Sequence, residues 1–260
     1  VAKFIGSDHT HVIVSEEDFI EAVEYVIKAI ESYDITTVRA STGQYLLAKW
    51  IKANTDIKVM LGGDVADELW KGYKYFKSAP STGELNEESI RLLEEIHMYD
   101  GDRCCLGVCN NGIEIRLPHG HRDYVELALS IDPALQNPVL NGGIEKLLLR
   151  DAFKNSGYLP NEVLYRSKEA FSDGVSNTTR SWHEILQEKL NTQYSDEELK
   201  AAQAKYTHMP PPTKEALHFR LMFEKYYGTH ESTAKIIPHY WLPKWNGNVT
   251  EPSARVLSVY

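Results

Sequence analysis

The stretch KVMLGGDVADELWKGY, from Lys58 to Tyr73, places glycines and carboxylates directly after an apolar segment. Glycines that follow a strand let the backbone approach a ligand, and backbone N–H groups at a helix start can cradle phosphate. Asp64, Asp67 and Glu68 could hold Mg²⁺, which commonly bridges carboxylates to the phosphates of a nucleotide. Carboxylates at a helix start are also explained as capping residues that the helix dipole favours. The spacing alone leaves these two interpretations evenly matched.

A second polar cluster, LYRSKEAFSDG, covers residues 164–174 and contains Arg166, Lys168, Glu169 and Asp173. A lysine held in such a loop could neutralise the charge that grows on a departing pyrophosphate or on an oxyanion. The alternative is a solvated loop whose surface ion pairs each contribute about 0–1 kcal/mol. Taken by itself, this cluster supports both interpretations equally.

Other common site motifs do not occur in the sequence: it contains no G-x-x-x-x-G-K-[ST], no G-x-G-x-x-G and no H-E-x-x-H. The three cysteines lie between Cys104 and Cys109, where they offer too few ligands for zinc, so small core residues are the favoured interpretation. His9 and His11 share one face of an expected strand, and a metal site there is the minor alternative.

The elements that must position these residues are predicted from apolar spacing. Strands are expected in HTHVIV (residues 9–14) and IKVML (residues 57–61). Between them the pattern predicts two helices, one over residues 15–34 with Ser15 as its cap and Asp18 completing a capping box, and one that Ser41 caps. The alternation of strand, helix, helix and strand predicts an α/β fold.

Past Pro80 the pattern becomes helical. One long helix is expected from Asn86 to about Asn110, ended by Gly112 at the C′ position. Four more helices are expected at residues 142–157, 181–190, 195–206 and 213–228. The predicted architecture is therefore part of a parallel α/β sheet followed by a large helical C-terminal half.

Length, charge and composition exclude several classes of protein. The chain has 260 residues and is 42% hydrophobic, which is enough for a sizeable core. A formal net charge of −9 argues against nucleic acid as a partner. No apolar run reaches the length of a membrane span, no signal-peptide pattern opens the chain, and three cysteines do not make a disulfide framework. A cytoplasmic location and no membrane partner are expected.

The clusters also belong to a series of strings that resembles one family. TTVRAST, GGDVADELWKGYKYFKSAP, IEIRLP, NGGIEKLLLRDAF, SKEAFSDGV, TKEALHFR and HYWLPKW follow in the order and spacing of asparagine synthetases. The chain resembles the C-terminal, ATP-dependent synthetase domain of the glutamine-hydrolysing, animal-type enzymes over nearly its whole length. The resemblance implies a parallel sheet of the adenine-nucleotide alpha-hydrolase-like (PP-loop ATPase) class. It implies that residues 1–260 form one synthetase domain, without the N-terminal glutaminase domain and without the start of the nucleotide-binding sheet that carries the family's S-G-G-x-D-S loop.

The implied reaction is the ATP-dependent amidation of aspartate to asparagine through β-aspartyl-AMP, with Mg²⁺ and with ammonia supplied by glutamine hydrolysis. By resemblance, Gly62 and Gly63 fall on the Ser-Gly pair associated with the nucleotide, and Asp64 falls on the glutamate implicated in forming the adenylate. Asp67 resembles the ligand of Mg²⁺ and pyrophosphate. The expected partners are these small molecules, with a homodimer considered as well.

Residues outside the glycine turn also match the family pattern. Lys168 resembles the residue that steadies pyrophosphate departure, and Tyr73 resembles a residue near the intermediate. Arg39 and Arg116 are kept, and with His121 they are the expected substrate residues.

Three departures from the family pattern favour an alternative. The family writes S-G-E-G-S-D-E where this chain has GGDVADE, so Gly62 lacks a hydroxyl whose contact is worth about 1–3 kcal/mol. Asp64 is one methylene shorter than glutamate, and a displacement of about 1 Å can slow a reaction on the order of 10²-fold. His121 replaces an acidic residue, and a neutral imidazole cannot replace a carboxylate that anchors an ammonium group. The alternative is a catalytically impaired paralogue with a binding or regulatory role.

Overall fold

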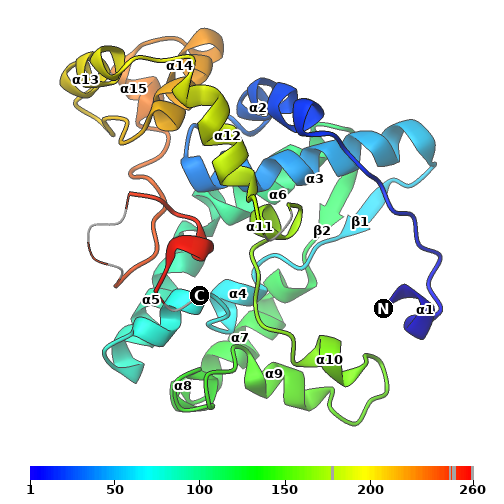
Figure 1. Cartoon of the computed structure of the whole chain (residues 1–260). Helices are drawn as coiled ribbons and strands as arrows, with labels where there is room; N and C mark the ends of the chain where they lie inside the picture. The colour runs from blue at the N-terminus through cyan, green and yellow to red at the C-terminus, as the bar shows by residue number, and fades with distance from the viewer. Residues whose placement is uncertain (177–178, 246, 248–249, 259–260) are drawn as a thin grey trace.

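The computed structural model describes residues 1–176, 179–245, 247 and 250–258 (Figure 1). The described residues form two short strands, β1 (Val59–Leu61) and β2 (Glu114–Arg116), which run parallel with Met60 opposite Ile115. The strand predicted at residues 57–61 is confirmed, whereas β2 was not predicted from the apolar pattern. The predicted parallel α/β arrangement holds only in part, because helices dominate the described chain. Val59 and Leu61 of β1 are exposed, and β1 pairs only with β2 among the described residues.

Helices α2 (Glu16–Ile30), α3 (Ile35–Asn54) and α6 (Asp100–Cys109) contact one another, and α6 also contacts β2 (Figure 1). α2 begins with the predicted capping box, in which the Ser15 hydroxyl accepts from the Asp18 backbone N–H at 3.1 Å. The apolar face of α2 packs against α3, α12 (Trp182–Asn191) and α14 (Lys214–Tyr227) in a continuous buried core. This core fixes the position of α3, which supplies one wall of the site described below.

The start of α3 corrects the sequence-based prediction. Asp34 caps the helix, because its carboxylate accepts from the Thr37 backbone N–H at 2.8 Å and from the Thr37 hydroxyl at 2.7 Å. Ser41 lies inside the helix, where its hydroxyl donates to the Thr37 carbonyl at 2.7 Å. The Ser41 prediction is therefore wrong, since a serine inside a helix can satisfy its hydroxyl on the preceding turn. The earlier start brings Arg39 into the helix.

The single helix predicted from Asn86 to Asn110 is divided into two. α5 (Thr82–Glu95) is separated from α6 by the 3₁₀ turn η2 (Ile96–Met98) and by Tyr99, whose φ of −130° and ψ of −92° are not helical. Tyr99 is buried, and its hydroxyl donates to the His239 carbonyl oxygen at 2.7 Å. Contact with a distant segment therefore outweighs local helix propensity. Gly112 has a φ of +71°, but the C-cap of α6 is Asn110, so Gly112 lies one residue beyond C′, the position predicted for it.

Three of the four later helices are confirmed as α12, α13 (Asp196–Lys205) and α14. The helix predicted at residues 142–157 is reduced to α9 (Leu147–Ala152), because Gly142, Gly143 and Lys146 adopt positive φ and delay its start. No strand forms over residues 9–14, which have no ladder partner in the described part of the chain. The remaining elements are α1 (Ala2–Ile5), α4 (Ala66–Leu69), η1 (Lys74–Ser78), η3 (Pro118–Gly120), α7 (Arg122–Ser130), α8 (Pro133–Gln136), α10 (Asn161–Leu164), α11 (Phe171–Gly174), α15 (Glu231–Ala234) and η4 (Ala254–Val256).

The cysteines and histidines set aside above are not gathered into a site. Cys104 is buried, whereas Cys105 and Cys109 are exposed, so the core interpretation holds for one of the three. Within the described ranges, no group of three or more His, Cys, Asp or Glu side chains is arranged to hold a metal ion. Over the same ranges, none of the helices has both the length and the apolarity that crossing a bilayer requires.

Candidate active site

A cavity of about 370 Å³ opens where β1 ends. Its walls come from the first half of α3, the turn after β1, α6, the loop before α11 and the chain after Trp241. Crevices at the carboxyl ends of parallel strands are common ligand sites in α/β folds, and pockets of this volume suit small molecules. Six buried side-chain polar atoms of the described residues lack a hydrogen-bond partner, and five belong to residues lining this cavity: Gln44, Arg103, Asp173, Trp182 and Trp241.

The turn after β1 forms the glycine edge of the cavity. The Gly62 backbone N–H donates to the Arg116 carbonyl at 2.9 Å, which extends the strand pairing by one residue. A Cβ atom on Gly62 would lie 2.7 Å from Leu117 Cδ2, so a serine here requires Leu117 to move, whereas a Cβ on Gly63 would meet open space. Val65 follows with a φ of +76°, which is a strained conformation for a β-branched residue. The turn thus exposes backbone to the cavity at the cost of local strain.

Asp67 is the centre of the charged part of the cavity. Its Oδ1 atom lies 2.6 Å from Lys146 Nζ, and its Oδ2 atom lies 2.6 Å from Lys168 Nζ. Burial alone would raise the pKa of Asp67, but the two ammonium groups outweigh it and hold that pKa well below its usual range. One carboxylate therefore holds two lysines from different segments beside the glycine edge, where the group carries a net positive charge.

Asp64 occupies the opposite side of the same turn. Its Oδ1 atom accepts from Arg103 Nη2 at 3.0 Å and from Gln44 Nε2 at 3.5 Å. Arg103 also forms an ion pair with Asp100, so α6 supplies a cation that is shared between two carboxylates. The structure thus brings Asp64, Asp67 and Lys168 to one cavity.

Tyr73 and the buried Glu68 form a hydrogen-bonded pair close to Asp67 and Lys168. The Tyr73 hydroxyl donates to Glu68 Oε1, and Lys168 Nζ lies 5.7 Å from the centre of the Tyr73 ring. Burial, together with the neighbouring carboxylates of Asp100 and Asp67, raises the pKa of Glu68 to about 8. Tyr73 therefore lies between an acidic group and the lysine that was predicted to contact pyrophosphate.

The sequence profile of the family "Asparagine synthase" matches residues 1–103 and 79–242 of this chain. The chain belongs to the asparagine synthase family. It is 45% identical over 260 residues to "Asparagine synthetase [glutamine-hydrolyzing]" of Gallus gallus and 43% identical over 260 residues to the protein of that name from Homo sapiens. It is also 44% identical over 261 residues to "Probable asparagine synthetase [glutamine-hydrolyzing]" of Acanthamoeba polyphaga mimivirus. These alignments cover 100% of this chain but only 45–46% of each relative, so the chain spans a little under half of their length.

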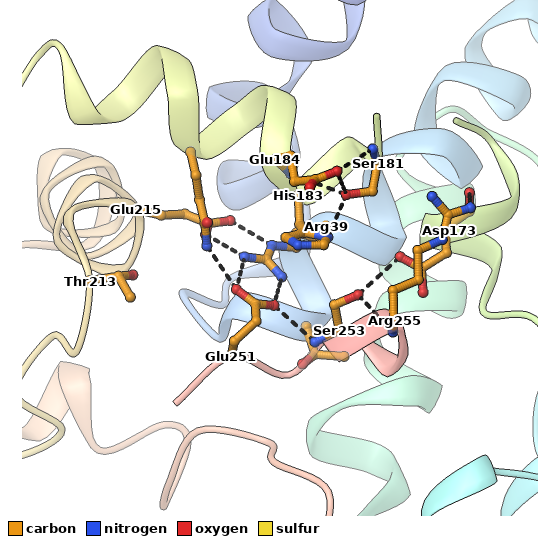
Figure 2. Close-up of polar contacts among 12 residues, drawn as sticks. Arg39, Asp173, Ser181, His183, Glu184, Thr213, Glu215, Glu251, Ser253 and Arg255 are labelled. Atoms are coloured by element: carbon orange, nitrogen blue, oxygen red, sulfur yellow. Dashed lines mark hydrogen bonds and ion pairs between the residues drawn. The ribbon is translucent and has the colours of Figure 1, made fainter. Parts of the chain in front are cut away.

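Arg39, one of the residues that match the asparagine synthase pattern, lines the cavity but is already engaged (Figure 2). Its Nε atom donates to Glu215 Oε1 at 2.6 Å, and its two terminal nitrogens donate to Glu215 and Glu251. Arg39 is 4% exposed and Glu215 is 1% exposed. A buried guanidinium held by two carboxylates has few donors left for a substrate, so its present contacts are structural.

Arg116 and His121, which the family resemblance suggested as substrate residues, lie away from this cavity. Arg116 is 62% exposed and pairs with Glu114 at 2.7 Å on β2. His121 is exposed at the start of α7, and neither residue lines the cavity. Arg116 ends β2 and His121 caps α7, and both side chains are exposed to solvent.

The C-terminal strap, defined here as residues Glu251–Arg255, was not predicted to contribute to the site. Its Glu251 binds Arg39, and its Ser253 hydroxyl donates to Asp173 Oδ1 at 3.2 Å (Figure 2). Arg255 Nη2 lies 2.9 Å from Glu169 Oε1 and donates to the Asp173 carbonyl at 2.9 Å. The strap therefore fixes the loop that carries Lys168. Long-range pairings of this kind leave no local signal in a sequence, and the same applies to Arg103 and Lys146.

The donor set at Asp67 fits a single-carboxylate Mg²⁺ site. Each carboxylate oxygen has two lone pairs, so Asp67 can bind its two lysines and still offer lone pairs to a metal ion. Mg²⁺ is commonly held by one or two carboxylates together with substrate phosphates. Both oxygens of Asp67 already contact lysines, so a metal ion held there would depend on the negative charge of substrate phosphates beside it.

Proposed function

We propose that this chain carries out the synthetase half of an asparagine synthetase: it activates aspartate with ATP and transfers the β-aspartyl group to ammonia. The observation that carries the proposal is the meeting of Asp64, Asp67, Tyr73 and Lys168 in one cavity beside the Gly62–Gly63 edge. Relatives named "Asparagine synthetase [glutamine-hydrolyzing]" match the chain over its whole length, which supports the same assignment. In this proposal the strands belong to an adenine-nucleotide alpha-hydrolase-like sheet.

In the activation step, a β-carboxylate oxygen of aspartate attacks the α-phosphorus of ATP, and the bond to the pyrophosphate oxygen breaks. Gly62 and Gly63 let the nucleotide approach the backbone. Lys168 neutralises the charge that develops on the departing pyrophosphate, and such a contact inside a cavity contributes on the order of 10²–10³ to the rate. Mg²⁺, when bound, supplies further positive charge at the phosphates, and Asp67 would hold it.

In the transfer step, ammonia attacks the activated carbonyl carbon, the bond to the AMP oxygen breaks, and the amine nitrogen loses a proton. Asp64 and Tyr73 face the cavity and would orient the intermediate. We propose glutamine as the source of ammonia, through a glutaminase domain of the kind that the relatives' name implies.

Exchange of labelled pyrophosphate into ATP tests the activation step without requiring ammonia. The expected result is exchange that depends on both aspartate and Mg²⁺. Exchange with another carboxylate in place of aspartate would identify a different amide-forming ligase. No exchange with any carboxylate would refute the proposal.

The strain at Val65 and the short side chain of Asp64 favour a second candidate, an impaired paralogue that binds ligands or an intact synthetase. Val65 has a φ of +76° where the family string has glycine, and Asp64 is held by Arg103. Under this alternative, the natural chain shows no exchange, whereas the Asp64→Glu, Val65→Gly double variant does.

A further inference from the structure

The two carboxylate oxygens of Asp64 have different surroundings. Its Oδ1 atom accepts from Arg103 Nη2 at 3.0 Å and lies 3.5 Å from Gln44 Nε2. Its Oδ2 atom lies beside the glycine edge, since a Cβ atom built on Gly62 would be 3.2 Å from it. Among the described residues, none donates a hydrogen bond to this Oδ2 atom. One oxygen of Asp64 is therefore held by the protein, while the other lies where a nucleotide would approach the backbone.

The start of α6 places Arg103 for this contact. Asp100 is the first residue of α6 because Tyr99 is not helical, and Arg103 follows three residues later on the same helix face. Arg103 Nη1 forms an ion pair with Asp100, while Nη2 binds Asp64. A guanidinium is planar and presents its donors in a rigid fork, so anchoring one terminal nitrogen fixes the direction of the other. Asp100 therefore orients Arg103, and Arg103 orients Asp64.

Arg103 is the stronger of the two contacts to Asp64. The side chains of Arg103 and Asp64 are only 16% and 11% exposed, and both line the cavity. An ion pair at this depth is screened by salt much less than a surface pair, and its hydrogen bond is stronger than one from a neutral amide. The Gln44 contact is neutral and is longer than the usual range of about 2.7–3.2 Å. The direction of the Asp64 carboxylate therefore depends mainly on Arg103.

We propose that Arg103 is a positioning residue, which holds Oδ1 of Asp64 so that Oδ2 stays directed at the glycine edge, where the aspartyl adenylate binds. The inference rests on the proposed function, since it names what orients a group that contacts the intermediate. Arg103 acts through Asp64, because both of its terminal nitrogens are bound to protein carboxylates. A displacement of about 1 Å at such a group can slow a reaction on the order of 10²-fold.

The Arg103→Lys variant is the first test, because it keeps the positive charge but removes the fork that joins two carboxylates. The expected result is a loss on the order of 10²-fold in aspartate-dependent pyrophosphate exchange at saturating substrates, with the KM for ATP nearly unchanged. Arg91→Lys is the matched control. Arg91 also binds two carboxylates through its terminal nitrogens, one of them three residues earlier, but it does not line the cavity. Exchange should be unchanged in that variant.

The same substitution in an Asp64→Ala background is the second test. Alanine leaves no carboxylate for Arg103 to orient, so Arg103→Lys should cause no further loss of exchange. This result separates positioning from a general effect on the fold, which would lower exchange in either background. Losses that multiply when the two substitutions are combined would show that Arg103 acts independently of Asp64 and would overturn the inference.

Binding of an unreactive analogue of β-aspartyl-AMP, with a sulfamate in place of the phosphate, is the third test. Binding is measured as ligand-induced thermal stabilisation, which does not require turnover. The expected result is an affinity that is about 10–100-fold weaker in Arg103→Lys, corresponding to a lost hydrogen bond between charged groups, with the affinity for ATP unchanged. Equal analogue affinity in Arg103→Lys and the unsubstituted chain would overturn the inference.

The outcomes separate this inference from the proposed function. Pyrophosphate exchange that is unchanged in Arg103→Lys would overturn the role of Arg103 while leaving the proposed function intact. Selective weakening of the analogue in a chain that shows no exchange would support the positioning role and refute the proposed ligase activity. An analogue that does not bind the unsubstituted chain would overturn both.

Discussion

Lys168 Nζ lies 2.6 Å from Asp67 Oδ2, and this ion pair joins the loop before α11 to the first turn of α4. The two polar clusters, which are ambiguous when each is considered alone, therefore belong to one cavity. Lys146 occupies the other oxygen of the same carboxylate. Asp67 thus organises two lysines before any ligand arrives, which avoids reorganisation at the moment of reaction.

Lys168→Met is expected to lower the rate of aspartate-dependent pyrophosphate exchange on the order of 10²–10³-fold, because the cation near the departing pyrophosphate is lost. Lys146 still pairs with Asp67 in this variant, so the fold should persist and circular dichroism should be unchanged. Lys235→Met is the control, since Lys235 is 56% exposed and pairs with Glu231 on α15. An exchange rate equal to that of the unsubstituted chain would contradict the assigned role of Lys168.

Arg39→Met is expected to lower the free energy of unfolding by about 3–5 kcal/mol, because it leaves two carboxylates near the cavity without their cation. Urea denaturation measures this change. Arg122→Met provides the comparison: Arg122 is 86% exposed and pairs with Glu126 at 2.8 Å, so the expected loss is below about 1 kcal/mol. Similar losses in both variants would show that the buried network adds no special stability.

The Val65→Gly variant should be more stable than the Val65→Ala variant, whereas inside helices alanine is more stabilising than glycine. Both variants remove the valine side chain, but only glycine relieves the positive φ, which disfavours other residues by roughly 1–2 kcal/mol. Glycine should therefore be the more stable of the two by about 1 kcal/mol in urea denaturation. At Ala201, an exposed position within α13, the Ala→Gly change should instead cost about 1 kcal/mol. An alanine variant at 65 that is more stable than the glycine variant would argue against strain there.

Lys71 should make the stability of the chain depend on pH in the alkaline range. Lys71 is 1% exposed, donates to Gln136 Oε1, and has a pKa that burial lowers from 10.5 to about 8. Above pH 8 the folded chain has released this proton while the unfolded chain retains it, so the free energy of unfolding rises toward pH 10.

The expected rise between pH 8 and pH 10 is on the order of 1–3 kcal/mol, and Lys71→Met should abolish it. Urea denaturation at several pH values measures the slope, with Lys235→Met as the exposed control. A slope that survives in Lys71→Met would assign the rise to other groups.

Features governed by neighbouring residues could be predicted from the sequence. The capping box of Ser15 and Asp18 needs only contacts three residues apart, and the helices α12 to α14 have their own start signals. Where two residues could each cap the same helix, the sequence pattern does not determine which of them does so. Asp34 and Ser41 are both good caps, and the buried bonds of Asp34 determine the outcome.

Features that depend on distant contacts could not be predicted from local patterns. Tyr99 interrupts a helix because its hydroxyl reaches His239, and Arg103 is a site residue because α6 turns it toward Asp64. The family resemblance suggested Asp67 and Lys168, which the structure places in contact at one cavity, since a resemblance carries information about spatial neighbours. It also suggested Arg116 and His121, whose exposed side chains do not line the cavity.

The exposed strand β1 has a consequence for handling the protein. Its outer edge is unpaired among the described residues, and Val59 and Leu61 are 40% and 74% exposed. Such an edge offers free backbone donors and acceptors beside apolar side chains, which is the arrangement that recruits another extended chain. Self-association at high concentration should therefore begin at β1, and a lysine at position 61 would be the simplest change to keep the purified chain dispersed.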